Sequence, residues 1–193
     1  LASVHSFRPD SMKLGVVGVG NVGSKVAAAA QAIGMKVLLN DPPRSRKEGP
    51  EGFVSLEEIL SECDIVTIHV PYSREGADRT HHLVDGSTLY KMKKGSYLFN
   101  SSRGEVVDNT ALYDALAAGH LAGIVLDVWE GEPDADRRLI AMADVATPHI
   151  AGYSVDGKAN GTIKAVSEVS AVLGLPLTQW RPTSLPLPTD PFI

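Results

Sequence analysis

Short apolar runs alternate along this chain with segments in which apolar residues recur every three or four positions. The runs are continuous and rich in Val, Ile and Leu, which is typical of parallel strands that are buried on both faces. The strands expected from these runs cover residues 13–18, 36–40, 65–70, 96–100, 123–127 and 145–147. The helices expected between and after them cover residues 22–33, 56–61, 86–92, 109–118, 137–142 and about 155–173. This alternation predicts an α/β fold in which right-handed crossovers join the strands of a parallel sheet.

Capping and helix-breaking residues mark the ends of several elements. Asp108 is suited to cap the helix that follows it, and Gly119 is suited to end that helix. The last helix is expected to stop before Gly174. Residues 41–52 are rich in Pro, Arg and Gly, so we expect a loop there. The tail, residues 176–193, holds five prolines and is expected to be extended and to lie outside the core.

Composition and charge narrow the class of protein. The chain has 193 residues, 44% of them hydrophobic and 21% charged, which suits one globular domain. Its net charge of -5 gives no electrostatic reason to expect nucleic-acid binding. No apolar run approaches the length of a membrane span, and residues 1–11 lack the layout of a signal peptide. The single cysteine, Cys63, cannot form an internal disulfide, which favours a reducing, cytoplasmic location.

A glycine motif stands between the first strand and the first helix. It reads Gly18-Val-Gly20-Asn21-Val22-Gly23, and its context makes it far more specific than a GxGxxG alone. Gly18 would make the tight turn, Gly20 would let the backbone approach a pyrophosphate, and Gly23 would let the helix pack against the strand. The helix N-terminus supplies N–H donors and a positive dipole to the phosphates. The motif predicts a Rossmann-type, doubly wound parallel sheet in three layers.

An acidic residue follows the second strand at the spacing that the motif requires. Asp41 lies 21 residues after Gly20, where a carboxylate can accept hydrogen bonds from the ribose hydroxyls of a dinucleotide. The same carboxylate would repel a 2′-phosphate, so the expected cofactor is NAD rather than NADP. Arg44 and Arg46 follow closely and weigh against that preference.

Polar residues that could carry chemistry follow the last three strands. Arg103 comes after the fourth strand, Asp127 and Glu132 after the fifth, and His149 after the sixth. Ligands of doubly wound sheets bind beyond the carboxyl ends of the strands, so these side chains are expected at one edge. Alcohol oxidation needs a base for the hydroxyl proton, which a histidine supplies near neutral pH. A carboxylate can orient that imidazole, and an arginine can bind a substrate carboxylate with two hydrogen bonds.

Each of these residues also has a structural interpretation. His149 could cap a turn, Glu132 could be a solvated loop charge, Arg103 could form a surface ion pair, and Asp127 could cap a helix. Their joint occurrence favours a catalytic site. The other histidines, 5, 69, 81, 82 and 120, are expected to be structural, and the absence of a Cys/His cluster predicts no metal site.

The same segments resemble the NAD-binding domain of the D-isomer-specific 2-hydroxyacid dehydrogenases. The resemblance covers about residues 13–175. It rests on the glycine motif and on four further segments, Asp41-Pro-Pro-Arg44, 103–112, 125–133 and 147–153, with 157–162 as a final piece. Within the family, the resemblance is to the branch that oxidises 4-phosphoerythronate. Three segments indicate this branch by their residues, namely Asp41-Pro-Pro-Arg44, Asp-Asn-Thr-Ala-Leu112 and His149-Ile-Ala-Gly-Tyr153.

The resemblance implies a role for each matching residue. Arg103, Glu132 and His149 would be catalytic, with Arg103 binding the substrate and His149 acting as acid and base. The expected cofactor contacts are Gly18, Gly20, Asn21, Val22, Gly23, Asp41, Val70, Pro71, Ser101, Ser102, Arg103, Asp127 and Gly152. Tyr153 would touch a phosphorylated 2-hydroxyacid, and the implied pathway is pyridoxal phosphate synthesis. A homodimer is also implied, because these domains pair through their own surface.

The chain departs from that branch in three respects. Val70 stands where a threonine is common, and Ser101 and Ser102 replace an expected Ala-Cys pair. The substrate domain of the family has no counterpart here. Residues 1–12 would be the end of a connecting helix and a loop, 13–175 the cofactor domain, and 176–193 a proline-rich tail. Such a domain is expected to bind NAD but to turn over poorly by itself, because half of the cleft is missing.

Two other functions are compatible with the same residues. One is another dehydrogenase or reductase of the family, acting on phosphoglycerate, glyoxylate or hydroxypyruvate, since the missing domain selects the substrate. The other is an NAD(H)-sensing binding protein that uses the fold for regulated association.

Overall fold

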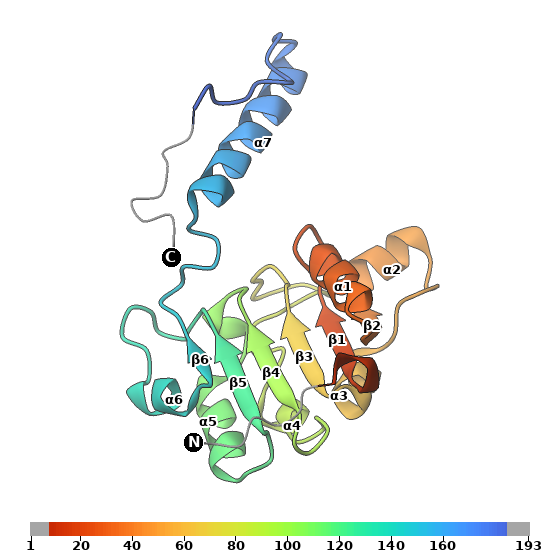
Figure 1. Cartoon of the computed structure of the whole chain (residues 1–193), viewed down its shortest axis with the longest axis vertical. Coiled ribbons are helices and arrows are strands. Elements are labelled where there is room, and N and C mark those ends of the chain that lie inside the picture. The colour runs from red at the N-terminus through yellow and green to blue at the C-terminus, as the bar shows by residue number, and fades with distance from the viewer. Residues whose placement is uncertain (1–7, 185–193) are drawn as a thin grey trace. The chain divides into compact units, whose positions relative to one another are not determined.

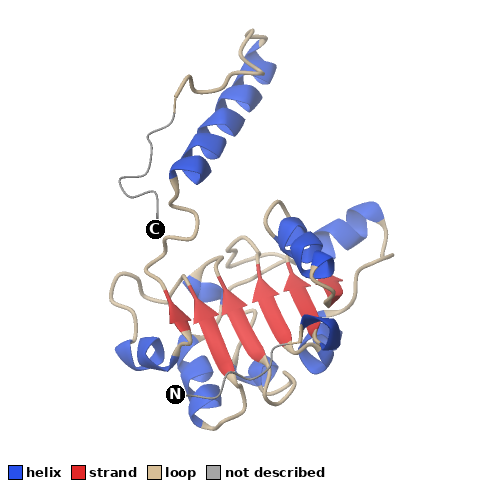
Figure 2. Cartoon of the chain, in the orientation of Figure 1, coloured by secondary structure: helices blue, strands red, loops and turns tan. Residues whose placement is uncertain are grey.

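The computed structural model describes residues 8–184 and contains one six-stranded parallel sheet (Figures 1 and 2). The order across the sheet is β2-β1-β3-β4-β5-β6. The strands are β1 Lys13–Val17, β2 Lys36–Asn40, β3 Ile65–Ile68, β4 Tyr97–Asn100, β5 Gly123–Leu126 and β6 Val145–Ala146. The expected α/β fold with a parallel sheet is therefore confirmed.

Seven α-helices and two short 3₁₀ helices occur within the described residues. They are η1 Pro9–Ser11, α1 Gly23–Ala32, α2 Pro42–Glu48, α3 Leu56–Glu62, α4 Gly86–Leu89, η2 Gly104–Val106, α5 Asn109–Ala117, α6 Arg137–Met142 and α7 Val155–Leu173. Asp108 caps α5 by accepting a hydrogen bond from the Ala111 N–H, and Gly174 ends α7 in a left-handed conformation. Both ends lie where the capping residues predict.

The chain divides into two compact units, residues 1–148 and residues 149–193. The first unit contains the whole sheet and helices α1–α6. The second contains α7, which Ser154 caps by accepting a hydrogen bond from the Gly157 N–H. Its tail begins with a turn over residues 176–179 rather than the expected extended segment, because the Ser167 hydroxyl holds the Thr178 carbonyl at 2.9 Å. The expected connecting segment up to residue 7, and the tail beyond 184, lie outside the described residues.

Apolar residues on both faces of the sheet form the core of the first unit. On one face, α3, α4, α5 and α6 contribute Leu60, Leu89, Leu112 and Leu139 to one buried cluster. On the other face, Ala27 and Ala30 of α1 belong to a second buried cluster. Val16 and Val17 are neighbours in β1 and fall in different clusters, as the two-residue period of a strand requires. The arrangement is the expected three-layer sandwich of helices, sheet and helices.

The strand order reverses at β1. The chain passes from β1 through α1 to β2 on one side of β1, then returns through α3 to β3 on the other side. Such a reversal leaves a crevice beyond the carboxyl ends of β1 and β3, because the connections leave toward opposite sides. The glycine motif follows β1 directly, so the fold brings it to this crevice.

The expected loop at 41–52 is wrong, since residues 42–48 form α2. Asp41 caps this helix, and Pro42 and Pro43 occupy its first positions, where a missing N–H costs nothing. Several strands also end earlier than their apolar runs. Gly18, residues 69–70, Asp127 and Thr147 leave the sheet at its carboxyl edge, where the chain turns into the loops of the crevice.

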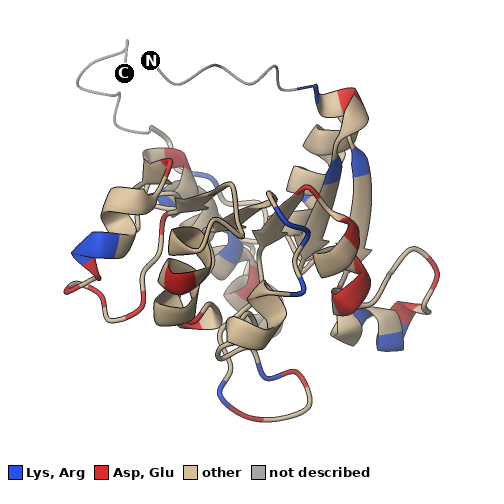
Figure 3. Cartoon of the chain, turned by 90° about the horizontal axis from the view of Figure 1, so that it is seen from below, with Lys and Arg blue, Asp and Glu red and all other residues tan. Residues whose placement is uncertain are grey.

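Charged residues of both signs are interspersed along the ribbon (Figure 3). None of the helices within residues 8–184 is both long enough and apolar enough to cross a membrane. The same residues contain no group of three or more His, Cys, Asp or Glu side chains arranged to hold a metal ion.

The burial of Cys63 generates a testable prediction. Cys63 follows α3, is fully buried, and burial raises the pKa of its thiol to about 12. The thiolate is the reactive form, so we expect native Cys63 to react with a thiol reagent at pH 8 at least about a hundredfold more slowly than in denaturant. Reaction with a chromogenic disulfide, followed by absorbance, measures this rate.

The matched control is Ser61→Cys in a Cys63→Ser background, because Ser61 is exposed on α3, two residues before Cys63. The control thiol should react rapidly in the native protein. Equal rates for the two thiols would contradict the buried position of Cys63.

Candidate functional site

The glycine motif forms a turn that only small residues allow. Gly18 has a φ of +88°, and a β-carbon there would lie 2.6 Å from the His69 carbonyl oxygen. A β-carbon on Gly23 would lie 1.9 Å from the Gly18 carbonyl oxygen. Gly20 differs, since a β-carbon there would meet no atom within 4 Å, and this glycine lines a cavity. Gly18 and Gly23 are therefore required by the fold, whereas Gly20 leaves open space where a ligand can approach.

Helix α1 begins beside this open space. Val22 is at the N-cap position and makes no side-chain capping bond. Asn21 and Val22 are both exposed. The first turn of α1 can thus direct N–H groups and its positive dipole toward an anion.

Asp41 holds the glycine loop and the start of α2 together. Its Oδ2 accepts a hydrogen bond from the Val19 N–H at 2.8 Å, and its Oδ1 accepts one from the Arg44 N–H at 3.0 Å. Two backbone donors therefore fix the orientation of the carboxylate at the carboxyl end of β2. A carboxylate offers about four acceptor sites, so it can still accept from ribose hydroxyls.

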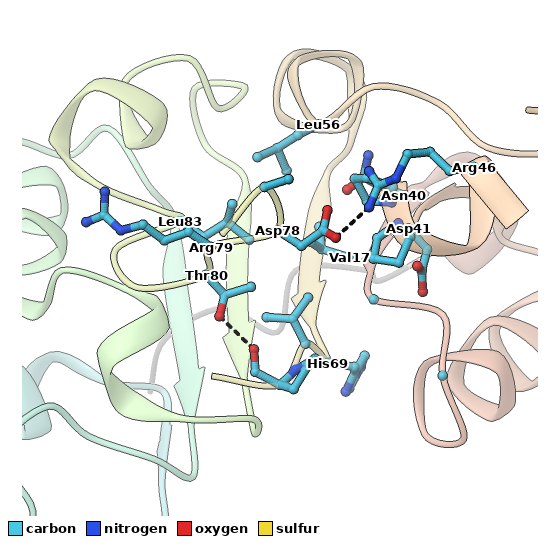
Figure 4. A pocket seen from close by; sticks show the side chains of 17 residues that line it. Val17, Asn40, Asp41, Arg46, Leu56, His69, Asp78, Arg79, Thr80 and Leu83 are labelled. Carbon is cyan, nitrogen blue, oxygen red and sulfur yellow. Dashed lines mark hydrogen bonds and ion pairs between the residues drawn. The ribbon is translucent and has the colours of Figure 1, made fainter. Parts of the chain in front are cut away.

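A cavity of about 310 Å³ lies next to Asp41 (Figure 4). That volume falls within the usual range of small-molecule sites. Its polar lining residues come from β2, α2, the end of β3 and the loop after β3, and its apolar ones include Leu56 and Leu83. The cavity occupies the crevice at the strand reversal, where the adenosine half of a dinucleotide would bind.

A second cavity, of about 570 Å³, shares three lining residues with the first. The shared residues are His69, Val70 and Pro71. The remaining lining residues are Val22, Tyr72, Ser101, Ser102 and Arg103. The two cavities therefore adjoin along the carboxyl edge of the sheet. Together they bring the glycine motif, Asp41, Val70, Pro71 and the Arg103 segment into one groove.

His69 lines both cavities, although only a structural role was expected for it from the sequence. Burial lowers the pKa of His69 below its usual value. Its Nε2 lies 3.0 Å from the Thr67 hydroxyl. The imidazole is therefore neutral at physiological pH and adds no charge to the middle of the groove. Its position directly after β3 is the signal that could have marked it.

A buried asparagine shapes the loop that carries Arg103. Asn100 Oδ1 accepts from the Ser102 N–H at 3.0 Å and from the Ser102 hydroxyl at 2.8 Å. Its Nδ2 donates to the Arg103 carbonyl at 2.9 Å. The Arg103 guanidinium in turn donates to the Ser102 carbonyl at 2.6 Å. Asn100, the last residue of β4, thus holds the loop in which Ser101, Ser102 and Arg103 line the second cavity. The sequence alone did not indicate this role of Asn100.

The loop after β5 carries two carboxylates with defined partners. Glu132 Oε1 accepts a hydrogen bond from the Trp129 N–H at 2.7 Å. Asp127 is buried, and its Oδ1 accepts one from the Thr147 hydroxyl at 2.6 Å. The Trp129 indole donates to the Thr147 carbonyl at 2.9 Å. These bonds attach the loop to the chain that follows β6.

A third carboxylate attaches the same loop to the Arg103 segment. Glu130 accepts from His82 at 2.6 Å and from the Asn109 N–H at 3.2 Å, while its own N–H donates to Asn109 Oδ1 at 3.0 Å. Gly104 lies against the Trp129 backbone so closely that a β-carbon would be 2.1 Å from its carbonyl. The loops of Arg103 and Glu132 are therefore fixed to each other. Sequence reasoning missed Glu130 and His82, because their contacts span 48 residues.

His149, Gly152 and Tyr153 belong to the second unit. His149 has a φ of +57°, a left-handed conformation that is uncommon for residues other than glycine and concentrates at functional sites. The Tyr153 N–H donates to the Ile150 carbonyl at 2.9 Å, and the Lys158 ammonium lies 3.5 Å from the centre of the Tyr153 ring. Arg103 and Glu132 belong to the first unit, so the expected meeting of His149 with them stays a prediction.

Known proteins share both the sequence and the fold. Residues 2–151 match the model of the D-isomer specific 2-hydroxyacid dehydrogenase, NAD binding domain. The chain is 46% identical over 191 residues to the erythronate-4-phosphate dehydrogenase of Bacteroides thetaiotaomicron, covering 99% of this chain and 54% of that protein. It is 43% identical to the protein of that name from Proteus mirabilis, covering 97% of this chain and 50% of the relative. The chain thus spans about half the length of these curated relatives.

Two solved structures with bound NAD have the same fold. The D-lactate dehydrogenase of Aquifex aeolicus, complexed with NAD and lactic acid, aligns with a TM-score of 0.73 and 34% identity over 90% of this chain and 57% of that one. The NAD complex of the D-isomer specific 2-hydroxyacid dehydrogenase from Lactobacillus delbrueckii ssp. bulgaricus aligns with a TM-score of 0.76 and 30% identity over 96% and 59%. Rossmann-type fold and NAD as cofactor are therefore both established. The chain belongs to the D-isomer-specific 2-hydroxyacid dehydrogenases, as their NAD-binding domain.

Proposed function

We propose that this chain is the cofactor domain of an enzyme that oxidises 4-phosphoerythronate at C2 with NAD. The product would be 2-oxo-3-hydroxy-4-phosphobutanoate, in pyridoxal phosphate synthesis. The observation that carries the substrate assignment is the identity of 43–49%, over most of the chain, to relatives named erythronate-4-phosphate dehydrogenase. The groove from Asp41 to Arg103 supports it, because it provides a cofactor site that ends at a cation for a carboxylate substrate.

The residues of the groove would hold the cofactor as follows. Asp41 accepts the hydroxyls of the adenosine ribose, and the loop at Gly20 lets the N-terminus of α1 approach the pyrophosphate. Asn21, Val22, Val70 and Pro71 line the path between the two halves. Ser101, Ser102, Asp127 and Gly152 lie along the nicotinamide half, which accepts the hydride when NAD is bound.

Three side chains would carry out the proton chemistry. Arg103 binds the substrate carboxylate through two hydrogen bonds and polarises the oxygen at C2. The His149 imidazole takes the hydroxyl proton as the alcohol becomes a ketone. The Glu132 carboxylate stabilises the imidazolium that forms, and Tyr153 contacts the substrate. The same proposal includes a cytoplasmic location and a homodimer paired through this domain.

Substrate selectivity tests the proposal directly. The gene product that contains this chain, at its natural full length, should reduce NAD with 4-phosphoerythronate and not with 3-phosphoglycerate or glycerate. The appearance of NADH is followed by absorbance. Turnover of another 2-hydroxyacid without turnover of 4-phosphoerythronate would contradict the narrow assignment and favour another enzyme of the family.

Replacement of the proposed base separates catalysis from binding. His149→Ala should lower kcat of the full-length protein by about 10²–10⁴-fold, because the hydroxyl proton loses its acceptor. NADH affinity should stay within about twofold, since the imidazole is not a cofactor contact in this scheme.

The matched control is His120→Ala, because His120 precedes β5 at the opposite edge of the sheet and bonds to the Met92 carbonyl. This variant should retain kcat. A His149→Ala enzyme with full activity would remove His149 from the mechanism.

Two glycines of the motif should respond differently to the same substitution. Gly20→Ala should fold normally and weaken NADH binding by at least about tenfold, ~1.4 kcal/mol, because the added methyl projects into the space for the pyrophosphate. Gly23→Ala should lower the free energy of unfolding by about 3 kcal/mol or more, because the methyl would overlap the Gly18 carbonyl.

Thermal unfolding and NADH fluorescence titration distinguish the two effects. Loss of stability in Gly20→Ala, or a fully stable Gly23→Ala, would contradict the separate roles of these glycines.

A further inference from the structure

An ion pair joins two segments that line the first cavity, the one next to Asp41, which we call the adenosine cavity. The Arg46 Nη2 on α2 lies 2.5 Å from the Asp78 Oδ2 on the loop after β3. Both side chains line the cavity that Asp41 also lines, and Figure 4 shows them pointing toward each other. They are 57% and 41% exposed, so a bound ligand could still reach either of them.

The loop that carries Asp78 is held at its base. The Thr80 hydroxyl donates to the Pro71 carbonyl at 2.6 Å and accepts from the Ser73 N–H at 2.7 Å. The Thr80 N–H donates to the Ser73 carbonyl at 2.9 Å. The Arg79 N–H closes a turn on the Gly76 carbonyl at 3.2 Å. These bonds define where Asp78 lies, so its contact with Arg46 does not depend on a free loop.

The other arginines near the cavity are directed elsewhere. Arg44 donates two hydrogen bonds to Glu48, at 2.9 and 2.6 Å, and a third to the Val19 carbonyl at 2.6 Å. Arg79 lines the cavity, but its guanidinium extends away from Asp41 in Figure 4. Arg46 is therefore the lining cation placed on the helix that follows the ribose carboxylate.

NADP sites of this fold use an arginine close to the end of the second strand to bind the 2′-phosphate, and Arg46 lies in the corresponding region of this chain. A guanidinium already paired with a carboxylate is less available for a phosphate, because the ion pair must first be broken. The Asp78 carboxylate also adds a negative charge to the lining of this cavity.

We propose that Asp78 determines cofactor specificity, by holding Arg46 away from the 2′-phosphate position and so favouring NAD over NADP. Asp41 excludes the 2′-phosphate directly, whereas Asp78 acts through Arg46. The arginines that follow Asp41 in the sequence are thus compatible with NAD, because each is paired with a carboxylate of its own.

The test compares NADH and NADPH affinities of four forms of the chain by fluorescence titration. These are the wild type, Asp78→Asn, Arg46→Gln and the double variant. Asp78→Asn should tighten NADPH binding about three- to tenfold and leave NADH within about twofold. The gain should disappear in the double variant, and it should shrink between about 20 mM and about 200 mM salt.

Glu75→Gln is the matched control, because it removes one negative charge from the same loop and Glu75 does not line the cavity. It should leave NADPH affinity within about twofold. An equal gain in Glu75→Gln, or a gain that persists without Arg46, would overturn the proposal. So would an unchanged NADPH affinity in a folded Asp78→Asn variant.

The single variant Arg46→Gln gives an independent result if Asp78→Asn does not fold. Since Arg46 is held by Asp78, its removal should leave NADPH affinity within about twofold. A loss of more than about threefold that is also present in the double variant, where position 78 carries no charge, would mean that Arg46 already reaches the 2′-phosphate, and the proposal would fail.

Discussion

The cofactor groove depends on the close approach of Gly23 to the carbonyl oxygen of Gly18. A β-carbon at position 23 would lie 1.9 Å from that oxygen, well inside any allowed contact. This approach lets α1 begin directly after the turn that follows β1, so the helix N-terminus faces the crevice at the strand reversal. Two residues that follow β2 are held against this turn. Asp41 bonds to the Val19 N–H, and Arg44 donates to the Val19 carbonyl.

A similar backbone approach organises the other end of the groove. Gly104 meets the Trp129 backbone, and Glu130 adds hydrogen bonds to His82 and Asn109. The segment of Arg103 and the loop of Glu132 therefore act as one body, although they follow different strands. Under the proposed function such a connection matters for hydride transfer, since displacement of a catalytic group by about 1 Å can cost two orders of magnitude in rate. In that mechanism Asn100 and Glu130 would be positioning residues, because each holds the backbone of a neighbour.

Sequence reasoning predicted those features that local pattern determines. The apolar runs located every strand, because parallel strands buried on both faces leave few polar positions. The glycine motif and Asp41 located the crevice, because their spacing follows from one strand–turn–helix–strand unit. Helix α2 was missed, since Pro42 and Pro43 were interpreted as helix breakers although they occupy the first helical turn. Contacts between distant segments were also missed. Arg46 and Asp78 are 32 residues apart, and nothing in the local pattern of either predicts the other.

The charges of the groove are divided along its length, and this division gives a dinucleotide a preferred direction. The adenosine end contains the Asp41 carboxylate and the ion pair of Arg46 and Asp78, while the guanidinium of Arg79, which also lines this end, extends away from Asp41 (Figure 4). The opposite end contains Arg103, and His69 between them is kept neutral by burial. The ribose hydroxyls can donate hydrogen bonds to the Asp41 carboxylate at one end, whereas a hydroxyacid carboxylate can bind the Arg103 guanidinium at the other. A 2′-phosphate would instead require a cation at the end that contains Asp41. Under the proposed function, selection of the cofactor and placement of the substrate rest on the same separation of charged groups, and Asp78 contributes to it because it is paired with Arg46.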